Sequence, residues 1–235
     1  MSRSQIGVIS FPGSNGDWDA YHALVDSLGV PVRMLDHRER HLSGIAALVI
    51  PGGFSYGDYL RCGAIARFSP IMDSVREFAI RGGPILGICN GFQILTEAHL
   101  LPGALLRNQR LRFQCRWTHI RVEQNASPWT TGCDEGEVLR LPIAHGDGCY
   151  FADSETLTRI EDAGQVIARY CDASGRVTSE TNVNGSLHGI AAVANEAKTV
   201  VGMMPHPERA TELLLGGDDG RRLLRGLLDF LSVAV

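Results

Sequence analysis

The sequence lacks the features that mark several large classes of protein. Its 235 residues carry 22 Lys and Arg against 26 Asp and Glu, a formal net charge of −4, and no block of basic residues stands out. Nucleic-acid binding needs a basic patch or stripe, so nucleic acid is not an expected partner. The apolar run at the N-terminus ends at Pro12 and Gly13, far short of the roughly 20 residues that a membrane span requires. We therefore expect a cytoplasmic protein with no membrane partner.

Paired cysteines and metal-binding motifs are also missing. The six cysteines lie at positions 62, 89, 115, 133, 149 and 171, without a C-x-x-C pair. In a cytoplasmic chain this scatter argues against a disulfide framework and against a zinc site. Residues 37–41 read His-Arg-Glu-Arg-His, which misplaces the Glu of an H-E-x-x-H motif. We expect a solvated polar turn there and no bound metal.

What the sequence does contain is an alternation of strand and helix patterns. Short apolar runs predict strands at 6–11, 32–35, 46–50 and 84–88, and helical spacing predicts helices at 17–28, 70–80 and 92–100. Such alternation predicts a parallel sheet covered by helices on both faces. The second half is less regular, with extended runs at 111–124 and 139–143 that fit antiparallel strands. Further strands are expected at 166–170, 190–194 and 200–204, before a closing amphipathic helix that contains Leu223, Leu227 and Leu231.

No repeat, low-complexity tract or linker divides the chain. We therefore expect one domain over residues 1–235. Its predicted class is α/β, with a mostly parallel central sheet flanked by helices and extra antiparallel strands in the second half.

A cysteine at the end of a predicted strand carries the strongest chemical signal. Residues 84–95 read Pro-Ile-Leu-Gly-Ile-Cys89-Asn-Gly-Phe-Gln-Ile-Leu, so a buried strand ends in G-x-C-x-G and a helix follows at once. This is the nucleophile-elbow pattern with Cys in place of Ser. The sulfur would lie beside a helix N-terminus, which favours the thiolate, and the N–H of Asn90 would point into an oxyanion hole. The alternative is a buried cysteine in an ordinary strand–helix turn.

A thiolate that performs acyl transfer also needs a general base and a group that orients it. The segment Met204-Pro-His206-Pro-Glu208-Arg209 follows a late strand. Prolines on both sides of His206 favour an extended backbone, in which residues i and i+2 project to the same side. We therefore expect Glu208 to hold the imidazole of His206. Alone, His-Pro-Glu would fit a surface loop, but together with the Cys89 elbow it predicts a catalytic triad.

A glycine-rich loop, Pro-Gly-Gly-Phe-Ser-Tyr-Gly-Asp at 51–58, follows the strand at 46–50. In a parallel sheet this loop lies at the same carboxyl edge as Cys89. We assign the second oxyanion donor to the N–H of Gly53 or Phe54, against the alternative of a simple glycine turn. A P-loop is excluded because no G-K-[ST] follows. Cys62 comes soon after this loop and could lie near the site, but we favour the interpretation of a packed thiol.

Together these segments resemble the class I glutamine amidotransferases, and in particular the glutaminase subunits of phosphoribosylformylglycinamidine synthase. The matching segments are G-I-C-N-G-F-Q, P-G-G-F-S-Y-G-D-Y-L-R-C-G-A-I-A, M-M-P-H-P-E-R, A-H-G-D-G at 144–148 and N-V-N-G-S at 182–186. They extend the resemblance over essentially the whole chain. The long G-F-S-Y-G-D-Y-L-R-C-G match separates this member from its class relatives.

The resemblance implies a flavodoxin-like class I amidotransferase fold, a Cys89–His206–Glu208 triad and a γ-glutamyl thioester. It implies that Gln93 contacts the substrate L-glutamine and that His145 lies near the glutamine site or the interface. The family often has Glu where this chain has Asp147, which leaves the role of that carboxylate open.

The resemblance also implies partners. The released ammonia would serve a large synthetase subunit, accompanied by a small bridging subunit, that makes formylglycinamidine ribonucleotide in de novo purine biosynthesis. The sequence has no ATP-binding fingerprint, so we expect no cofactor in this chain and assign ATP and Mg²⁺ to the synthetase subunit.

Three alternatives share part of the pattern. Another class I amidotransferase, serving a different ATP-dependent synthetase, would share the triad but not the long glycine-rich loop. A cysteine peptidase or chaperone of similar fold would not be expected to carry the late His-Pro-Glu. A regulatory binding module with a dead site is disfavoured by the intact Cys, His and Glu.

Overall fold

The structure, a computed structural model, describes residues 5–233. Nine strands form one sheet in the order β2-β1-β3-β4-β11-β10-β9-β6-β7. Their bounds are β1 (Gln5–Ser10), β2 (Val32–Asp36), β3 (Ile45–Ile50), β4 (Ile85–Ile88), β6 (Gln114–Val122), β7 (Val138–His145), β9 (Val166–Cys171), β10 (Ile190–Ala194) and β11 (Val200–Met203).

The sheet divides into a parallel and an antiparallel part. Neighbouring strands from β2 to β11 run parallel, and those from β11 to β7 run antiparallel. Strands β4 and β11 are buried at every residue, because helices cover both faces of a parallel sheet and leave no side for water. The predicted α/β class, with extra antiparallel strands in the second half, is confirmed.

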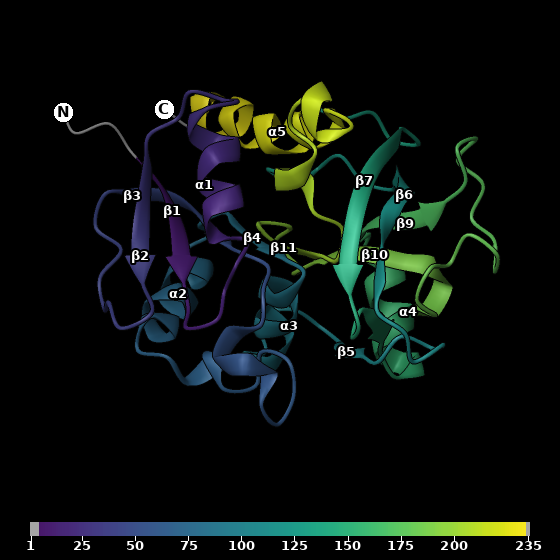
Figure 1. Cartoon of the computed structure of the whole chain (residues 1–235), viewed down its shortest axis with the longest axis horizontal. Helices are drawn as coiled ribbons and strands as arrows, with labels where there is room; N and C mark the ends of the chain where they lie inside the picture. The colour runs from purple at the N-terminus through teal and green to yellow at the C-terminus, as the bar shows by residue number, and fades with distance from the viewer. Residues whose placement is uncertain (1–4, 234–235) are drawn as a thin grey trace.

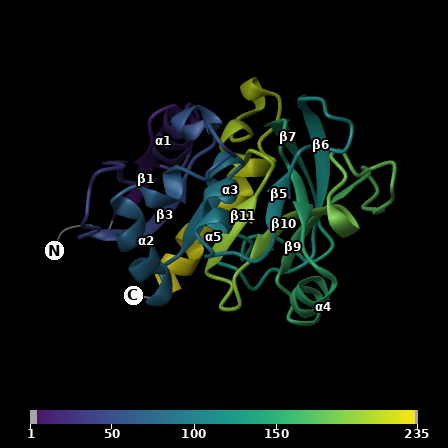
Figure 2. The same cartoon turned by 90° about the horizontal axis from the view of Figure 1, so that it is seen from below.

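Five α-helices accompany the sheet in the described part of the chain: α1 (Asp17–Val25), α2 (Ile71–Ile80), α3 (Asn90–Glu97), α4 (Ser154–Asp162) and α5 (Asp219–Val233). Figure 1 shows α1 and α5 together in the upper part of the view, with α2 and α3 below. In Figure 2 β1 and β3 lie on the left and β6, β9 and α4 on the right, with β11 between them. Helix α5 packs through Leu223, Leu224 and Leu227, which are all buried, as its apolar spacing predicts.

The differences from the sequence prediction lie at boundaries and in short elements. The helix predicted at 17–28 ends at Val25, the helix predicted at 92–100 begins at Asn90, and the strand predicted at 111–124 covers only Gln114–Val122. Helix α4 was not predicted, because Ile160 is its only fully buried residue and one apolar position gives no periodicity. A small second sheet pairs β5 (Ala104–Leu106) with β8 (Cys149–Phe151), and strands of this length leave little sequence signal.

Among residues 5–233, no helix is long and apolar enough to cross a membrane. The same residues contain no group of three or more His, Cys, Asp or Glu side chains arranged to hold a metal ion.

The parallel strands bring the predicted functional segments to one edge of the sheet. Strand β4 ends directly before Cys89, β11 leads to His206, and β3 leads to the glycine-rich loop. The carboxyl ends of adjacent parallel strands are where open α/β sheets form their sites.

Candidate active site

Cys89 lies at a strained turn between β4 and α3. Its backbone adopts φ 50° and ψ −102°, a conformation that a residue with a side chain holds only when its surroundings enforce it. The N–H of Cys89 donates to the carbonyl of Met203 at 2.7 Å, which ties the turn to β11. A Cβ atom at Gly91 would lie 1.9 Å from the carbonyl oxygen of Ile50, so only glycine fits there. The predicted nucleophile elbow is present.

His206 and Glu208 form a buried pair beside the elbow. Nδ1 of His206 lies 2.6 Å from Oε1 of Glu208, and both residues are buried. The N–H of His206 donates to the carbonyl of Pro142 on β7 at 2.8 Å. Glu208 does not continue an extended chain, because Pro207–Arg209 forms a 3₁₀ turn, η4. The expected contact is therefore formed, although the turn rather than an extended backbone brings the carboxylate to the ring.

Gly52 is the point where His206 and Cys89 come together. A Cβ atom at Gly52 would lie 2.8 Å from Cε1 of His206 and 3.5 Å from Cβ of Cys89. Burial disfavours the charged imidazole, but the charges of Glu208 and Cys89 outweigh it and raise the pKa of His206 to about 10. His206 is thus an imidazolium at neutral pH. A protonated ring beside a cysteine can stabilise a thiolate and deliver a proton to a leaving group.

Two backbone N–H groups next to Cys89 remain available for a substrate. Among the backbone hydrogen bonds that residues 5–233 form outside their helices and strands, none is donated by the N–H groups of Gly53 and Asn90. The N–H of Phe54 donates to the carbonyl of Gly13 at 3.0 Å. Of the two sequence candidates for the second oxyanion donor, Gly53 is therefore available in this conformation and Phe54 is not.

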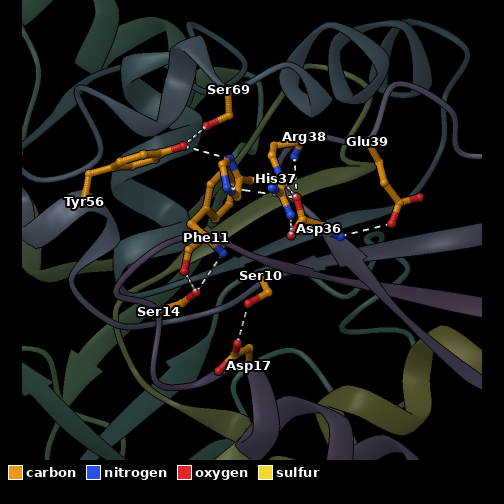
Figure 3. Close-up of polar contacts among 10 residues, drawn as sticks. All are labelled: Ser10, Phe11, Ser14, Asp17, Asp36, His37, Arg38, Glu39, Tyr56 and Ser69. Atoms are coloured by element: carbon orange, nitrogen blue, oxygen red, sulfur yellow. Dashed lines mark hydrogen bonds and ion pairs between the residues drawn. The ribbon is translucent and has the colours of Figure 1, made fainter.

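The glycine-rich loop is held in place by polar contacts that Figure 3 draws. The hydroxyl of Tyr56 lies 2.9 Å from Nδ1 of His37 and 2.9 Å from Oγ of Ser69. Ser14, in the neighbouring turn, donates through Oγ to the carbonyl of Phe11 at 2.6 Å. Tyr56 itself has a positive φ of 53°, so these contacts hold a backbone that is costly for a non-glycine residue.

The polar turn expected at 37–41 is present, since residues 37 and 38 form a turn and Arg38, Arg40 and His41 are exposed. His37 differs from its neighbours, because its side chain is only 20% exposed. It packs edge-on against the ring of Tyr56, with 5.7 Å between the ring centroids. Strand β2 ends at Asp36, directly before His37, and this fixes the position of the histidine. Through its contacts with Tyr56, His37 anchors the glycine-rich loop.

Cys89 opens onto a cavity of about 480 Å³. A cavity of this size fits a small polar ligand such as an amino acid. Besides Cys89, its wall includes the predicted site residues Gly53, Phe54, Gln93 and His145, together with Asp58, Cys62, Arg107 and Asp147.

Gln93 and Asn90 brace one side of this cavity. Nδ2 of Asn90 donates to Oε1 of Gln93 at 2.9 Å and to Oδ1 of Asp58 at 3.1 Å. Nε2 of Gln93 donates to the carbonyl of Asp147 at 2.6 Å. The carboxamide of Gln93 is therefore already engaged at both ends, and the residue orders the cavity wall as well as lining it.

His145 also lines the cavity, and it is neutral. Burial and the nearby charge of His206 lower the pKa of His145 to about 4. Its Nδ1 lies 3.1 Å from Oδ1 of Asn108, so the amide oxygen accepts the ring proton. Nε2 is buried without a partner among the described residues, which leaves it as an acceptor. Sequence reasoning missed Asn108, because an isolated Asn in a loop carries no recognisable pattern.

Cys62 and two carboxylates form an acidic corner of the cavity. Sγ of Cys62 donates to Oδ2 of Asp147 at 3.2 Å. Burial, followed by the charge of Asp58, raises the pKa of Cys62 far above its usual range. Burial also raises the pKa of Asp58. Cys62 therefore lines the cavity, which is the alternative to the packed thiol that we favoured from the sequence, and it does so as an unreactive thiol.

Known proteins with similar sequences are glutamine amidotransferases, in agreement with the geometry of the site. Residues 3–215 match the family of CobB/CobQ-like glutamine amidotransferase domains. A phosphoribosylformylglycinamidine synthase subunit PurQ from Salinibacter ruber is 54% identical over 230 residues, which cover 98% of each chain. The PurQ subunit from Moorella thermoacetica is 55% identical over 226 residues, or 96% of each chain.

Solved structures of amidotransferase subunits are also similar to this chain. A chain of the PurLQS structure from Thermotoga maritima superposes with a TM-score of 0.86 at 42% identity, covering 98% of this chain and 100% of that one. A putative GMP synthase subunit from Thermoplasma acidophilum shares the fold alone, with a TM-score of 0.63 at 14% identity and coverage of 100% and 97%.

Proposed function

The chain belongs to the CobB/CobQ-like glutamine amidotransferase family, and from this premise we propose that it is the glutaminase subunit of a phosphoribosylformylglycinamidine synthase. The observation that carries the proposal is the meeting of Cys89 with the His206–Glu208 pair at the wall of a cavity. The relatives indicate which synthetase the chain serves. Proteins more than half identical to this chain over nearly its whole length are named as subunits of phosphoribosylformylglycinamidine synthase. A different amidotransferase and a cysteine peptidase are accordingly not favoured.

The first chemical step is attack on glutamine. The thiolate of Cys89 attacks the side-chain amide carbon, and the carbonyl oxygen becomes an oxyanion that the N–H groups of Gly53 and Asn90 stabilise. The C–N bond then breaks, and His206 gives its proton to the leaving nitrogen. The products are a γ-glutamyl thioester on Cys89, one ammonia and a neutral His206.

Hydrolysis of the thioester completes the cycle. Neutral His206 takes a proton from water, whose oxygen attacks the thioester carbon. The C–S bond breaks and the product leaves as the γ-carboxylic acid, which gives its proton to solvent and becomes glutamate. The thiolate of Cys89 and the imidazolium of His206 are restored. Glu208 stays ionised at 2.6 Å from Nδ1 throughout, where it fixes the ring orientation and stabilises its charge.

L-glutamine fits the cavity by charge as well as by size. Asp58 and Asp147 lie on its wall and suit the α-ammonium group, whereas Arg107, also on the wall, suits the α-carboxylate. Arg107 pairs with Asp147 across 3.7 Å, so these two charges balance each other before substrate binds. The neutral His145 adds a hydrogen-bond acceptor without adding charge.

The proposed partner is a large synthetase subunit that binds ATP and Mg²⁺ and converts formylglycinamide ribonucleotide, with a small bridging subunit completing the complex. The relative from Thermotoga maritima, whose structure is that of PurLQS, supports this assignment. The glutaminase chain itself would need no cofactor. Because the proposed partner consumes ATP, we propose the cytoplasm as the compartment.

Reconstitution tests the proposed function. Glutamine hydrolysis is measured for the isolated chain, then with the large subunit, then with ATP and formylglycinamide ribonucleotide added. We expect hydrolysis to rise by at least about tenfold across the series, which corresponds to about 1.4 kcal/mol of coupling. Formylglycinamidine ribonucleotide should appear with glutamine as nitrogen donor. Failure of the complete mixture to use glutamine would refute the assignment.

A further inference from the structure

The glycine-rich loop has a strained backbone next to the nucleophile. Tyr56, Asp58 and Leu60 have positive φ values of 53°, 51° and 72°. None of them is a glycine, and a backbone of this kind persists only where the surrounding structure enforces it. At the start of the same loop, a Cβ atom on Gly52 would lie 3.5 Å from Cβ of Cys89. The strained part of the loop is therefore only a few residues away from the reacting sulfur.

The end of the loop that approaches Cys89 pairs with the turn that follows β1. The N–H of Phe54 donates to the carbonyl of Gly13 at 3.0 Å, and the carbonyl of Gly52 accepts a hydrogen bond from the same turn. Between these two bonds, Ser14 and Gly53 face each other in an antiparallel bridge. The N–H of a residue in such a non-hydrogen-bonded pair points away from its partner. Pairing with the turn therefore directs the N–H of Gly53, which lines the cavity of Cys89.

The other end of the loop is fastened by one hydroxyl group. The hydroxyl of Tyr56 lies 2.9 Å from Nδ1 of His37, directly after β2, and 2.9 Å from Oγ of Ser69, shortly before α2 (Figure 3). Ser69 is buried, and the N–H of His37 donates to the carbonyl of Ser10 on β1 at 3.1 Å. Both partners of the hydroxyl are therefore anchored outside the loop. The N–H of Tyr56 also donates to the carbonyl of Pro12 in the turn after β1, at 2.6 Å.

We propose that Tyr56, His37 and Ser69 form a latch that positions the N–H of Gly53 for stabilisation of the oxyanion. The proposal rests on the proposed function, because it assigns positioning residues to the glutaminase reaction. None of the three latch residues lines the cavity of Cys89, so they act through the loop and not on the substrate. A loop released at Tyr56 can relax its positive φ, and the rotation turns the peptide units before it. The N–H of Gly53 then loses its direction toward the oxyanion.

This role predicts a specific change in kinetics. A donor that meets the oxyanion only in the tetrahedral state lowers the barrier without strengthening the binding of glutamine. Loss of one such donor costs roughly 10²–10³-fold in kcat. A misdirected N–H on Gly53 should therefore lower kcat and leave glutamine binding unchanged, whereas general damage to the site would weaken both.

Tyr56→Phe removes the latch hydroxyl and keeps the ring. Tyr59→Phe is the matched control, because Tyr59 lies in the same segment and is 74% exposed. Each variant is assembled with the synthetase subunit, ATP and formylglycinamide ribonucleotide, and kcat for glutamine hydrolysis is measured. Binding of L-glutamine is measured by calorimetry in complexes that carry Cys89→Ala as well, so that no reaction follows.

Glutamate γ-semialdehyde probes the oxyanion site directly. The thiolate of Cys89 adds to the aldehyde carbon, the electron pair of the C=O bond moves to oxygen, and the adduct is a tetrahedral oxyanion without a leaving group. With Tyr56→Phe we expect kcat and the affinity for the aldehyde each to fall by about tenfold, less than loss of the whole donor would cost. Glutamine binding should be unchanged, and Tyr59→Phe should match wild type in all three measurements.

Wild-type kcat and aldehyde affinity in Tyr56→Phe would overturn the proposal, and so would a loss of glutamine binding equal to the loss of kcat. If Tyr56→Phe does not fold, Ser69→Ala, which removes one of the two partners of the hydroxyl, is read by the same criteria. A wild-type complex that does not hydrolyse glutamine would instead refute the proposed function.

Discussion

Nδ1 of His206 lies 2.6 Å from Oε1 of Glu208, although a 3₁₀ turn begins between the two residues. The turn carries the carboxylate back to the ring, and the pair is almost fully buried, with side chains 2% and 1% exposed. In such surroundings an unpaired imidazolium would be costly. Glu208 therefore does two things for His206: it fixes the orientation of the ring, and it keeps the ring charged.

Substitution of His206 should lower the rate of glutamine hydrolysis more than substitution of Glu208. His206→Ala removes the group that moves protons in both chemical steps, and general acid–base catalysis contributes roughly 10²–10⁴-fold to rate. Glu208→Gln keeps the shape of the side chain and removes only its charge, so we expect a smaller loss. The measurement is kcat for glutamine hydrolysis in the assembled complex. Full activity in His206→Ala would exclude the triad.

The raised pKa of His206 should also appear in the pH dependence of stability. Its folded-state pKa of about 10 lies above the unfolded value of 6.5. The contribution of His206 to the free energy of unfolding is therefore fully present below pH 6.5 and is lost as the pH rises through about 10. We expect the difference in unfolding free energy between wild type and His206→Gln, measured in urea at several pH values, to shrink over that window. A difference that grows with pH would show that the folded protein holds the ring neutral.

Gly52 should be intolerant of a side chain. A Cβ atom there would lie 2.8 Å from Cε1 of His206, so Gly52→Ala must push the ring away from Cys89. We expect a large loss of kcat with thermal stability little changed, because the displaced group lies at the site and not in the core. Gly132→Ala is a suitable control, since its Cβ atom would come no closer than 3.4 Å to a neighbouring atom. Equal activity in the two variants would contradict the geometry described here.

The sequence predicted that the candidate site residues lie together, and the reason is physical. Cys89 and His206 follow buried strands, and the carboxyl ends of parallel strands meet at one edge, so topology alone brings them together. The position of Asn108 could not be predicted, because its contact with His145 spans 37 residues and depends on loop conformation. The N–H of Phe54 could not be excluded as an oxyanion donor either, since its acceptor is the carbonyl of Gly13, which belongs to a separate turn.

The antiparallel half was less predictable than the parallel half. Strand β6 alternates between partly exposed and buried positions toward its end, and its pairing with β7 and β9 is set by the packing of distant segments. Helix α4 shows the same limitation. Its start is fixed locally by Asp153, which accepts a hydrogen bond from the N–H of Thr156 at 2.8 Å, but its position depends on one buried side chain, Ile160.

Cys89→Ala in the assembled complex tests the central claim most directly. The substitution removes the sulfur that forms the thioester and is expected to leave the fold and the synthetase subunit unchanged. Formation of formylglycinamidine ribonucleotide is measured once with glutamine and once with ammonium chloride as nitrogen donor. Loss of the glutamine-dependent reaction with retention of the ammonia-dependent reaction is the predicted result. Glutamine-dependent synthesis at the wild-type rate in Cys89→Ala would contradict the account.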